Sequence, residues 1–364
     1  MPLFKTTQPT ILITSLISSH HFPPFNSSFP TQASSIMSND QQIQPGIVSN
    51  PDGTYTRSIQ FPSTPATPDH NTPSPVLSKD IPLNPKNQTW LRIYLPKHAL
   101  NESSTPNLML NLPLIVYFHG GGFVFMSAAS TTIHDFCVKL ASELSAIIIS
   151  VEYRLAPENR LPAAYDDAID TLQWLKTTQE RWLTQFCDFS CCFVMGTSAG
   201  ANIAYHAGLL ATQVTGDLSP QWACLAPLKI KGLILHHPFF GGLQRVGSEL
   251  GLIKDPFLTL SGTDLMWELS LPVGVDRDHE YCNPTVGGGS SQLEQVRLAG
   301  WRVLVSGCYD DPLINRQMEF ANMLKEKGLR TVAYFAEGHH SIELFVESKL
   351  KELFVILKIF IYSS

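Results

Sequence analysis

The pentapeptide Gly196-Thr197-Ser198-Ala199-Gly200 lies between two apolar stretches of this 364-residue chain. Residues 189–195 are rich in β-formers and predict a buried strand, and residues 201–211 carry small and apolar side chains at helical spacing. A serine at such a strand-to-helix turn projects above the sheet, at a helix end that favours negative charge. The spacing predicts Ser198 as a nucleophile, and the alternative is a glycine-rich turn without chemistry.

A serine hydroxyl is an effective nucleophile only when a base takes its proton and hydrogen-bond donors stabilise the oxyanion that forms. Candidate donors lie in His119-Gly120-Gly121-Gly122-Phe123, directly after a predicted strand at 113–118. Consecutive glycines let backbone N–H groups turn towards one point without obstruction by side chains. We expect the loop of Gly120, Gly121 and Gly122, together with the N–H of Ala199, to form the oxyanion hole.

The acid and the base are expected after the last two strands of the predicted sheet. Asp311 follows the strand at 302–306, with Asp310 as its competitor, and an aspartate there is also typical of a helix N-cap. His339 and His340 follow the strand at 331–335, and the residues alone leave the choice between them open. A histidine that takes the Ser198 proton and donates its other N–H to an aspartate completes a catalytic triad.

Three further residues adjoin these motifs and are predicted to bind substrate: Phe123, Thr197 and His237. The pair His236-His237 ends a strand, but no third ligand is near in sequence, so we predict no metal. No cofactor is expected either. The segments 153–158 and 162–167 carry Arg, Asp and Glu side chains, which we expect to form a structural network beside the glycine loop.

Strands and helices alternate along the chain, which predicts an α/β fold with a doubly wound, mostly parallel sheet. Residues 43–364 are predicted as one domain, with 43–88 as an irregular lid and 241–298 as a cap inserted over the carboxyl ends of the strands. Strands are predicted at 89–95, 113–118, 146–153, 189–195, 230–236, 302–306 and 331–335. Helices are predicted at 132–144, 165–176 (extending towards 186), 201–211, 262–269, 318–326 and 342–359.

Composition narrows the function classes. Apolar residues make up 44% of the chain, enough for a large core, and the net charge of −6 gives no basic footprint for nucleic acid. No apolar run is long enough to cross a membrane. Seven cysteines without paired metal spacing indicate a reduced, cytoplasmic setting. Residues 1–42 are expected to be a disordered or mis-annotated extension.

Five separated motifs, HGGGF, YRLAPE, GTSAG, DPL and GHH, together resemble the plant carboxylesterases of the hormone-sensitive-lipase-like group in the α/β-hydrolase superfamily. The resemblance implies Ser198 as nucleophile, Asp311 as the acid, His340 as the base, and Gly121, Gly122 and Ala199 as oxyanion donors. It implies hydrolysis of carboxylic esters without a cofactor. The lid and the 241–298 insertion are expected to enclose an apolar acyl pocket, which favours small to medium hydrophobic esters. Two departures are Thr197, where the group often has Asp or Ser, and Asn315, where it often has Asp.

The same plant group leaves two other functions open. Its gibberellin receptors keep the fold, lack the triad histidine and bind a small molecule without hydrolysing it. Its dehydratases use the same machinery for elimination. The presence of His340 disfavours a receptor function. The motifs do not distinguish hydrolysis from elimination.

Overall fold

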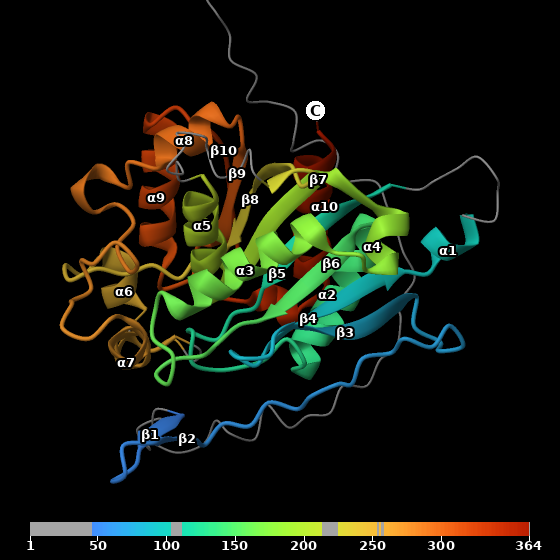
Figure 1. The fold of residues 1–364 in the computed structure, drawn as a ribbon. Coiled ribbons are helices and arrows are strands. Elements are labelled where there is room, and N and C mark those ends of the chain that lie inside the picture. The colour runs from blue at the N-terminus through green and yellow to red at the C-terminus, as the bar shows by residue number, and fades with distance from the viewer. Residues whose placement is uncertain (1–45, 103–110, 213–224, 253–254, 256–257, 364) are drawn as a thin grey trace, which may run out of the picture. The chain divides into compact units, whose positions relative to one another are not determined.

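An eight-stranded sheet forms the centre of the protein (Figure 1). The computed structural model describes residues 46–102, 111–212, 225–252, 255 and 258–363, so the prediction for residues 1–42 lies outside it. The strands lie in the order β10-β9-β8-β7-β5-β6-β4-β3; those from β10 to β6 run parallel, and β4 and β3 are antiparallel to their neighbours. The predicted doubly wound, mostly parallel sheet is confirmed. Its strands are β3 (Val76–Asn84), β4 (Thr89–Pro96), β5 (Leu112–Phe118), β6 (Ile147–Glu152), β7 (Cys187–Thr197), β8 (Ile230–His236), β9 (Arg302–Cys308) and β10 (Arg330–Ala336).

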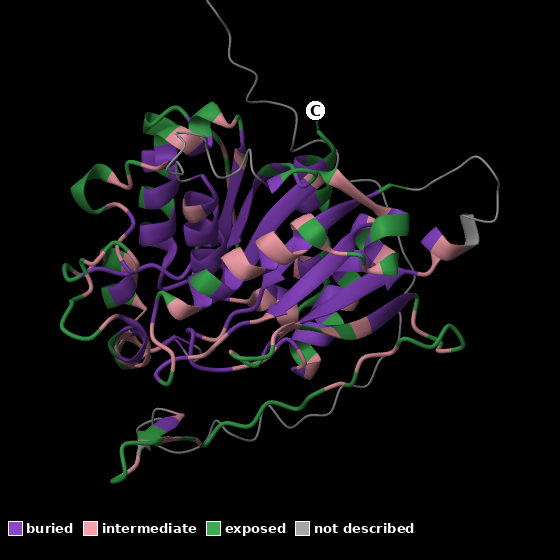
Figure 2. Ribbon diagram, in the orientation of Figure 1, coloured by how far each residue is buried: buried purple, intermediate pink, exposed green. Residues whose placement is uncertain are grey.

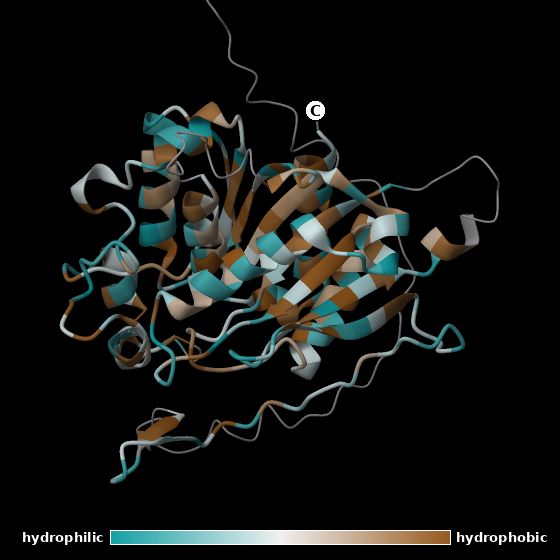
Figure 3. Ribbon diagram, viewed as in Figure 1, coloured by the Kyte–Doolittle hydropathy of each residue, from teal (hydrophilic) through white to brown (hydrophobic). Residues whose placement is uncertain are grey.

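Helices cover both faces of this sheet, because alternate side chains of its central strands are apolar on both sides. In β5, Leu114 and Val116 join one core cluster and Ile115 and Tyr117 join the other. The strands are buried and hydrophobic along most of their length (Figures 2 and 3). The first cluster packs under α3 (Ala163–Thr177), α5 (Ala199–Ala211) and α9 (Ile314–Glu326), and the second under α2 (Thr131–Leu144) and α10 (Glu347–Tyr362).

Regular structure begins earlier than residue 89, where the sequence predicted it. A two-stranded ribbon pairs β1 (Ile47–Ser49) with β2 (Tyr55–Arg57), and β3 pairs with β4 at the edge of the main sheet. The strand β3 contains Pro82 and the exposed Asp80, which obscure its pattern in the sequence. An edge strand tolerates both, because one of its sides needs no partner strand.

Two predicted helices are each divided. The helix predicted from 165 towards 186 is broken at Thr178, whose backbone is extended, and α4 (Arg181–Phe186) begins anew where the Glu180 carboxylate accepts from the N–H of Trp182. The helix predicted at 342–359 is a short 3₁₀ turn, η3 (Ile342–Leu344), followed by α10 after the extended Val346. This second break sets Glu343 apart from α10.

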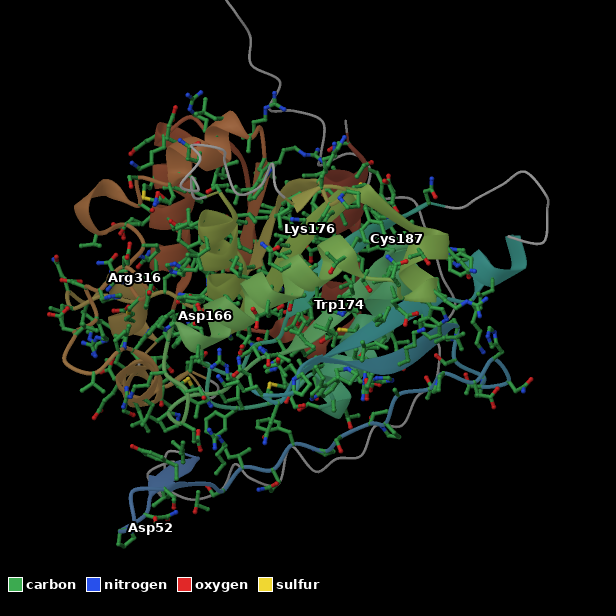
Figure 4. All side chains as sticks on the ribbon, in the orientation of Figure 1. Asp52, Asp166, Trp174, Lys176, Cys187 and Arg316 are labelled. Carbon is green, nitrogen blue, oxygen red and sulfur yellow. The ribbon has the colours of Figure 1, made fainter. Side chains whose placement is uncertain are left out.

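The predicted cap segment, 241–298, contains short helices and connectors. The predicted helix at 262–269 is confirmed as part of α7 (Leu260–Ser270). Arg316 of α9, labelled in Figure 4, pairs with Glu249 of α6 (Gly247–Gly251) at 3.0 Å. No helix within the described ranges is both long and apolar enough to cross a membrane. The remaining short helices are α1 (His98–Glu102), α6 (Gly247–Gly251), α7 (Leu260–Ser270), η2 (Val286–Gly288) and α8 (Leu293–Leu298).

Candidate active site

The candidate residues gather at one edge of the sheet because each follows a parallel strand. The glycine loop follows β5, Ser198 follows β7, Asp311 follows β9 and His340 follows β10. The pair His236-His237 comes at the end of β8, between them. Ligands of open α/β sheets bind at this carboxyl edge.

Ser198 occupies a strained turn between β7 and α5. Its backbone has φ 56° and ψ −121°, a region that costs about 1–3 kcal/mol for a residue with a side chain. A Cβ on Gly196 would lie 2.0 Å from the carbonyl oxygen of Gly200, so the turn closes only with glycine there. The turn after β8 holds Ser198 on both sides: its N–H donates to His236 O (2.9 Å), and its carbonyl accepts from Phe239 N (3.1 Å).

A continuous set of hydrogen bonds joins the three predicted triad residues. His340 Nε2 lies 3.1 Å from Ser198 Oγ, and His340 Nδ1 lies 2.8 Å from Asp311 Oδ2. All three side chains are buried, and Asp311 is fully so. The competitors lie elsewhere: Asp310 is exposed, and Nδ1 of His339 bonds to the carbonyl of His340.

Asp311 is held by four donors. Besides His340, its Oδ2 accepts from His237 Nδ1 (2.8 Å) and Gln317 Nε2 (2.9 Å), while its Oδ1 accepts from the backbone N–H of Leu313 (2.9 Å). Burial alone would raise the pKa of this carboxyl, but the charges and hydrogen bonds of His340 and His237 outweigh it and hold the pKa well below its usual range. Asp311 is therefore an anion whose geometry is fixed.

The glycine loop lies directly against the serine. A Cβ on Gly120 would be 3.3 Å from Ser198 Cβ, and Gly121 and Gly122 have φ of 113° and 62°, which glycine adopts without strain. The ring of His119 stacks on Tyr153, whose hydroxyl donates to His119 O at 2.9 Å. These contacts fix the loop beneath the sheet edge.

Three backbone N–H groups in this region are available to an oxyanion. Among the residues that the structure describes, none accepts a hydrogen bond from the N–H of Gly121, Gly122 or Ala199. Ala199 is the first residue of α5, so its N–H is one of those that a helix leaves unpaired. Met266 of α7 covers Gly122, where a Cβ would lie 2.2 Å from the methionine sulfur.

The three predicted substrate-binding residues all contact protein groups. Phe123 is buried against Trp267, with ring centroids 5.5 Å apart, and the hydroxyl of Thr197 accepts from Tyr117 at 3.3 Å. His237 has no exposed surface, and its ring nitrogens face Asp311 and Glu343. Each of the three side chains thus has a protein partner.

The predicted network between segments 153–158 and 162–167 is present at Arg154 and Asp167. Arg154 pairs with the buried Asp167 at 2.8 Å. Glu158, however, pairs with Arg57 of β2, whose guanidinium also donates to the carbonyls of Val124 and Ala156, each at 2.7 Å. Arg57 thus fastens the segment after β1 to the glycine loop.

Sequence reasoning missed Glu343 and Gln317, both buried beside the site. Gln317 lies six residues after Asp311, in α9, at a spacing that no helical periodicity brings together with it, and Glu343 reads as an ordinary acidic residue at a helix start. Two groups among the described residues bring three potential ligand atoms within 4.8 Å of one another: His236, His237 and Glu343, and His237, Asp311 and His340. In both, imidazole and carboxylate groups already pair with each other.

Comparison with known proteins agrees with this arrangement. A family model described as the alpha/beta hydrolase fold matches residues 115–343. Carboxylesterase 20 of Arabidopsis thaliana is 50% identical over 319 residues, covering 87% of this chain and 95% of that protein. The 3-O-acetylpapaveroxine carboxylesterase CXE2 of Papaver somniferum is 47% identical over 307 residues, covering 82% of this chain and 91% of that protein.

A solved esterase structure from Pyrobaculum calidifontis superposes with a TM-score of 0.61 at 25% identity, covering 79% of this chain and 84% of that one. The chain therefore belongs to the α/β hydrolase fold family and is a carboxylesterase of its plant, hormone-sensitive-lipase-like group.

Proposed function

We propose that the protein hydrolyses carboxylic esters by acyl transfer through Ser198, with His340 as the base and Asp311 as the residue that orients it. The observation that carries the proposal is the unbroken path from Ser198 Oγ to His340 Nε2 (3.1 Å) and from His340 Nδ1 to Asp311 Oδ2 (2.8 Å). Along this path His340 can accept the proton of Ser198, and Asp311 fixes the orientation of His340.

The steps follow from that path. Ser198 Oγ attacks the ester carbonyl while His340 Nε2 takes the hydroxyl proton, and the carbonyl oxygen becomes an oxyanion. The N–H groups of Gly121, Gly122 and Ala199 donate to that oxygen, with Gly120 shaping the loop. Collapse of the intermediate expels the alcohol, which leaves with the proton from His340. Water then attacks the acyl-enzyme and loses a proton to His340. The bond between the acyl carbon and Ser198 Oγ breaks, His340 returns the proton to Oγ, and the acid product leaves.

The substrates proposed are small to medium hydrophobic esters, with acetyl esters foremost. Two observations support a short acyl group. Met266 of the cap covers Gly122 and limits the room beside the oxyanion loop. The poppy relative carries the name of an O-acetyl compound, 3-O-acetylpapaveroxine. Segments 46–88 and 241–298 are proposed to act as lid and cap over this site.

The test is hydrolysis of p-nitrophenyl esters from acetate to dodecanoate by the wild type and by Ser198→Ala, with fluorophosphonate labelling of both. We expect kcat to fall on the order of 10⁶-fold in the variant, as for removal of such a nucleophile elsewhere, and labelling to disappear. Equal rates in the two proteins would end the proposal. A preference for dodecanoate would refute the short-acyl part alone.

The receptor and dehydratase alternatives are separated by the same proteins. A wild type that binds a gibberellin but neither hydrolyses esters nor takes the label is a receptor. A wild type that eliminates water from a hydroxyisoflavanone faster than it hydrolyses any ester is a dehydratase. The Ser198–His340 hydrogen bond favours hydrolysis over the receptor, because a binder needs no base at the serine.

A further inference from the structure

The turn after β8 contacts both ends of the proposed triad, although the mechanism above gives it no task. Its backbone holds Ser198 through His236 O and Phe239 N. Its side chain at His237 reaches Asp311, whose Oδ2 lies 2.8 Å from His237 Nδ1. One four-residue turn therefore touches the nucleophile and the orienting acid at once.

Both ring nitrogens of His237 face carboxylates. Nδ1 lies 2.8 Å from Asp311, and Nε2 lies 3.6 Å from Oε2 of Glu343. All three side chains are almost entirely buried. On a neutral ring that keeps its proton on Nδ1, the lone pair of Nε2 would face Oε2 of Glu343, with the thiol of Cys308, at 3.9 Å, as the other group within reach. Only the ring with a proton on each nitrogen presents a donor to both anions.

The balance of buried charges also favours a His237 ring that is protonated on both nitrogens. Two carboxylates so deep in the protein need cationic partners, because an uncompensated buried charge is costly. Among the described residues that contact Glu343, the charge partners are His236 (3.3 Å) and His237 (3.6 Å). His236 Nδ1 bonds to the hydroxyl of Ser306 at 2.9 Å, and burial lowers the pKa of His236, so the positive charge resides on His237.

We propose that His237 is a positioning residue of the active site: an imidazolium held between Asp311 and Glu343 that fixes Asp311 Oδ2 towards His340 and balances its charge. The inference deepens the proposed hydrolysis and rests on the same triad. Because His237 and His340 bond to one oxygen, a cation at His237 weakens the hold of Asp311 on a proton at His340.

The backbone of His237 is bonded on both sides of the turn. His237 adopts φ 47°, and its N–H donates to Ser306 O at 2.6 Å, so the turn is bonded to β9 as well as to Ser198. Its ring lies edge-on to that of His340, with centroids 4.9 Å apart. A cavity of about 30 Å³ borders the ring. The titratable groups that face His237 or line this cavity are Asp311, His340, Glu343, His236, Cys308, Tyr334, Lys349 and Glu352.

Kinetics of three variants test the inference: His237→Gln keeps a donor without charge, His237→Leu removes both, and Glu343→Gln removes the second anion. With p-nitrophenyl acetate we expect kcat of His237→Gln to fall about 10–100-fold with KM nearly unchanged, since the loss is one of positioning. The acid limb of its kcat/KM profile should move to higher pH by about one unit. Glu343→Gln should move it in the same direction by less.

His134→Gln is the matched control, because His134 is also buried but bonds to Arg92 and Tyr94, away from this edge. Its acid limb should coincide with that of the wild type. If His237→Gln loses kcat but keeps the wild-type acid limb, the residue is merely structural and the inference is overturned. Where His237→Leu fails to fold, the Gln variants carry the test.

A spectroscopic readout separates this inference from the proposed function. In protein labelled with ¹⁵N in the histidine rings, one of the twelve histidines should show imidazolium shifts at both nitrogens at pH 8. That signal should vanish in His237→Gln and persist in His134→Gln. If the wild type shows the imidazolium signal but no esterase activity, only the proposed ester hydrolysis is refuted. An active wild type without it overturns the inference.

Discussion

Oδ2 of Asp311 lies 2.8 Å from Nδ1 of His340 and 2.8 Å from Nδ1 of His237. One carboxylate oxygen thus serves two imidazoles that come from different strand ends. With Gln317 on the same oxygen and the Leu313 N–H on the other, the carboxylate has no freedom to rotate. The orientation of His340 is consequently set by residues from three separate segments.

Asp311→Asn should lower kcat about 10⁴-fold, because the amide offers N–H groups to imidazole nitrogens that must donate, and His340 then takes the wrong tautomer. Asp310→Asn is the matched control: this neighbour is exposed and lies outside the hydrogen-bond path, so its kcat should equal that of the wild type. Steady-state hydrolysis of p-nitrophenyl acetate measures both. If Asp310→Asn lowered kcat more than Asp311→Asn, Asp310 would be the acid of the triad and Asp311 would not.

Gly122→Ala should reduce kcat about 10²–10³-fold, since a Cβ there meets the Met266 sulfur at 2.2 Å and displaces an oxyanion donor. Adding Met266→Ala removes that collision, and activity should return in part, because φ of 62° still strains alanine. Gly300→Ala isolates the strain: its φ is 71° with no atom within 4 Å of the new Cβ. Its kcat should not change, and an equal loss at both glycines would contradict the assignment.

The pH dependence of stability should reveal the buried cation. Burial alone would lower the pKa of His237, but the hydrogen bonds with Asp311 and Cys308 and the nearby Glu343 carboxylate outweigh it and raise the pKa well above its ordinary value. Above about pH 6.5 the unfolded chain loses the proton that the folded protein keeps. The free energy of unfolding should therefore fall with rising pH by about 1.4 kcal/mol per unit more in the wild type than in His237→Gln. Urea unfolding from pH 6 to 9 measures this, and parallel curves would exclude the charge.

Arg57→Ala should loosen the segment that carries β1 and β2. It removes two charge-assisted bonds to carbonyls and the pair with Glu158, about 1–3 kcal/mol after allowance for partial exposure. Limited proteolysis should cut near residue 60 faster, and KM should rise if this segment covers the substrate. Arg297→Ala breaks an exposed pair with Glu294 and should leave both measurements unchanged. Identical proteolysis of the two variants would speak against a lid.

The sequence predicted the parts of the site whose signal is local. Ser198 and the glycine loop lie within short contiguous motifs, GTSAG and HGGGF. Asp311 and His340 each come soon after a strand that the residue pattern identifies. What joins them to Glu343 and His237 is a set of side-chain contacts between distant segments, and nothing near Glu343 in sequence marks it as buried. The edge strand β3 was missed for a related reason: its exposed, proline-containing pattern becomes a strand only through pairing with β4.

The two backbone hydrogen bonds between Ser198 and the turn after β8 also bear on redesign. They make the nucleophile and residues 236–239 a single module, in which the unfavourable dihedral of the serine is sustained by a neighbouring segment. Grafting only the serine, histidine and aspartate side chains onto another scaffold would leave that dihedral unsupported. Any transplant of this chemistry must carry both stretches of main chain together.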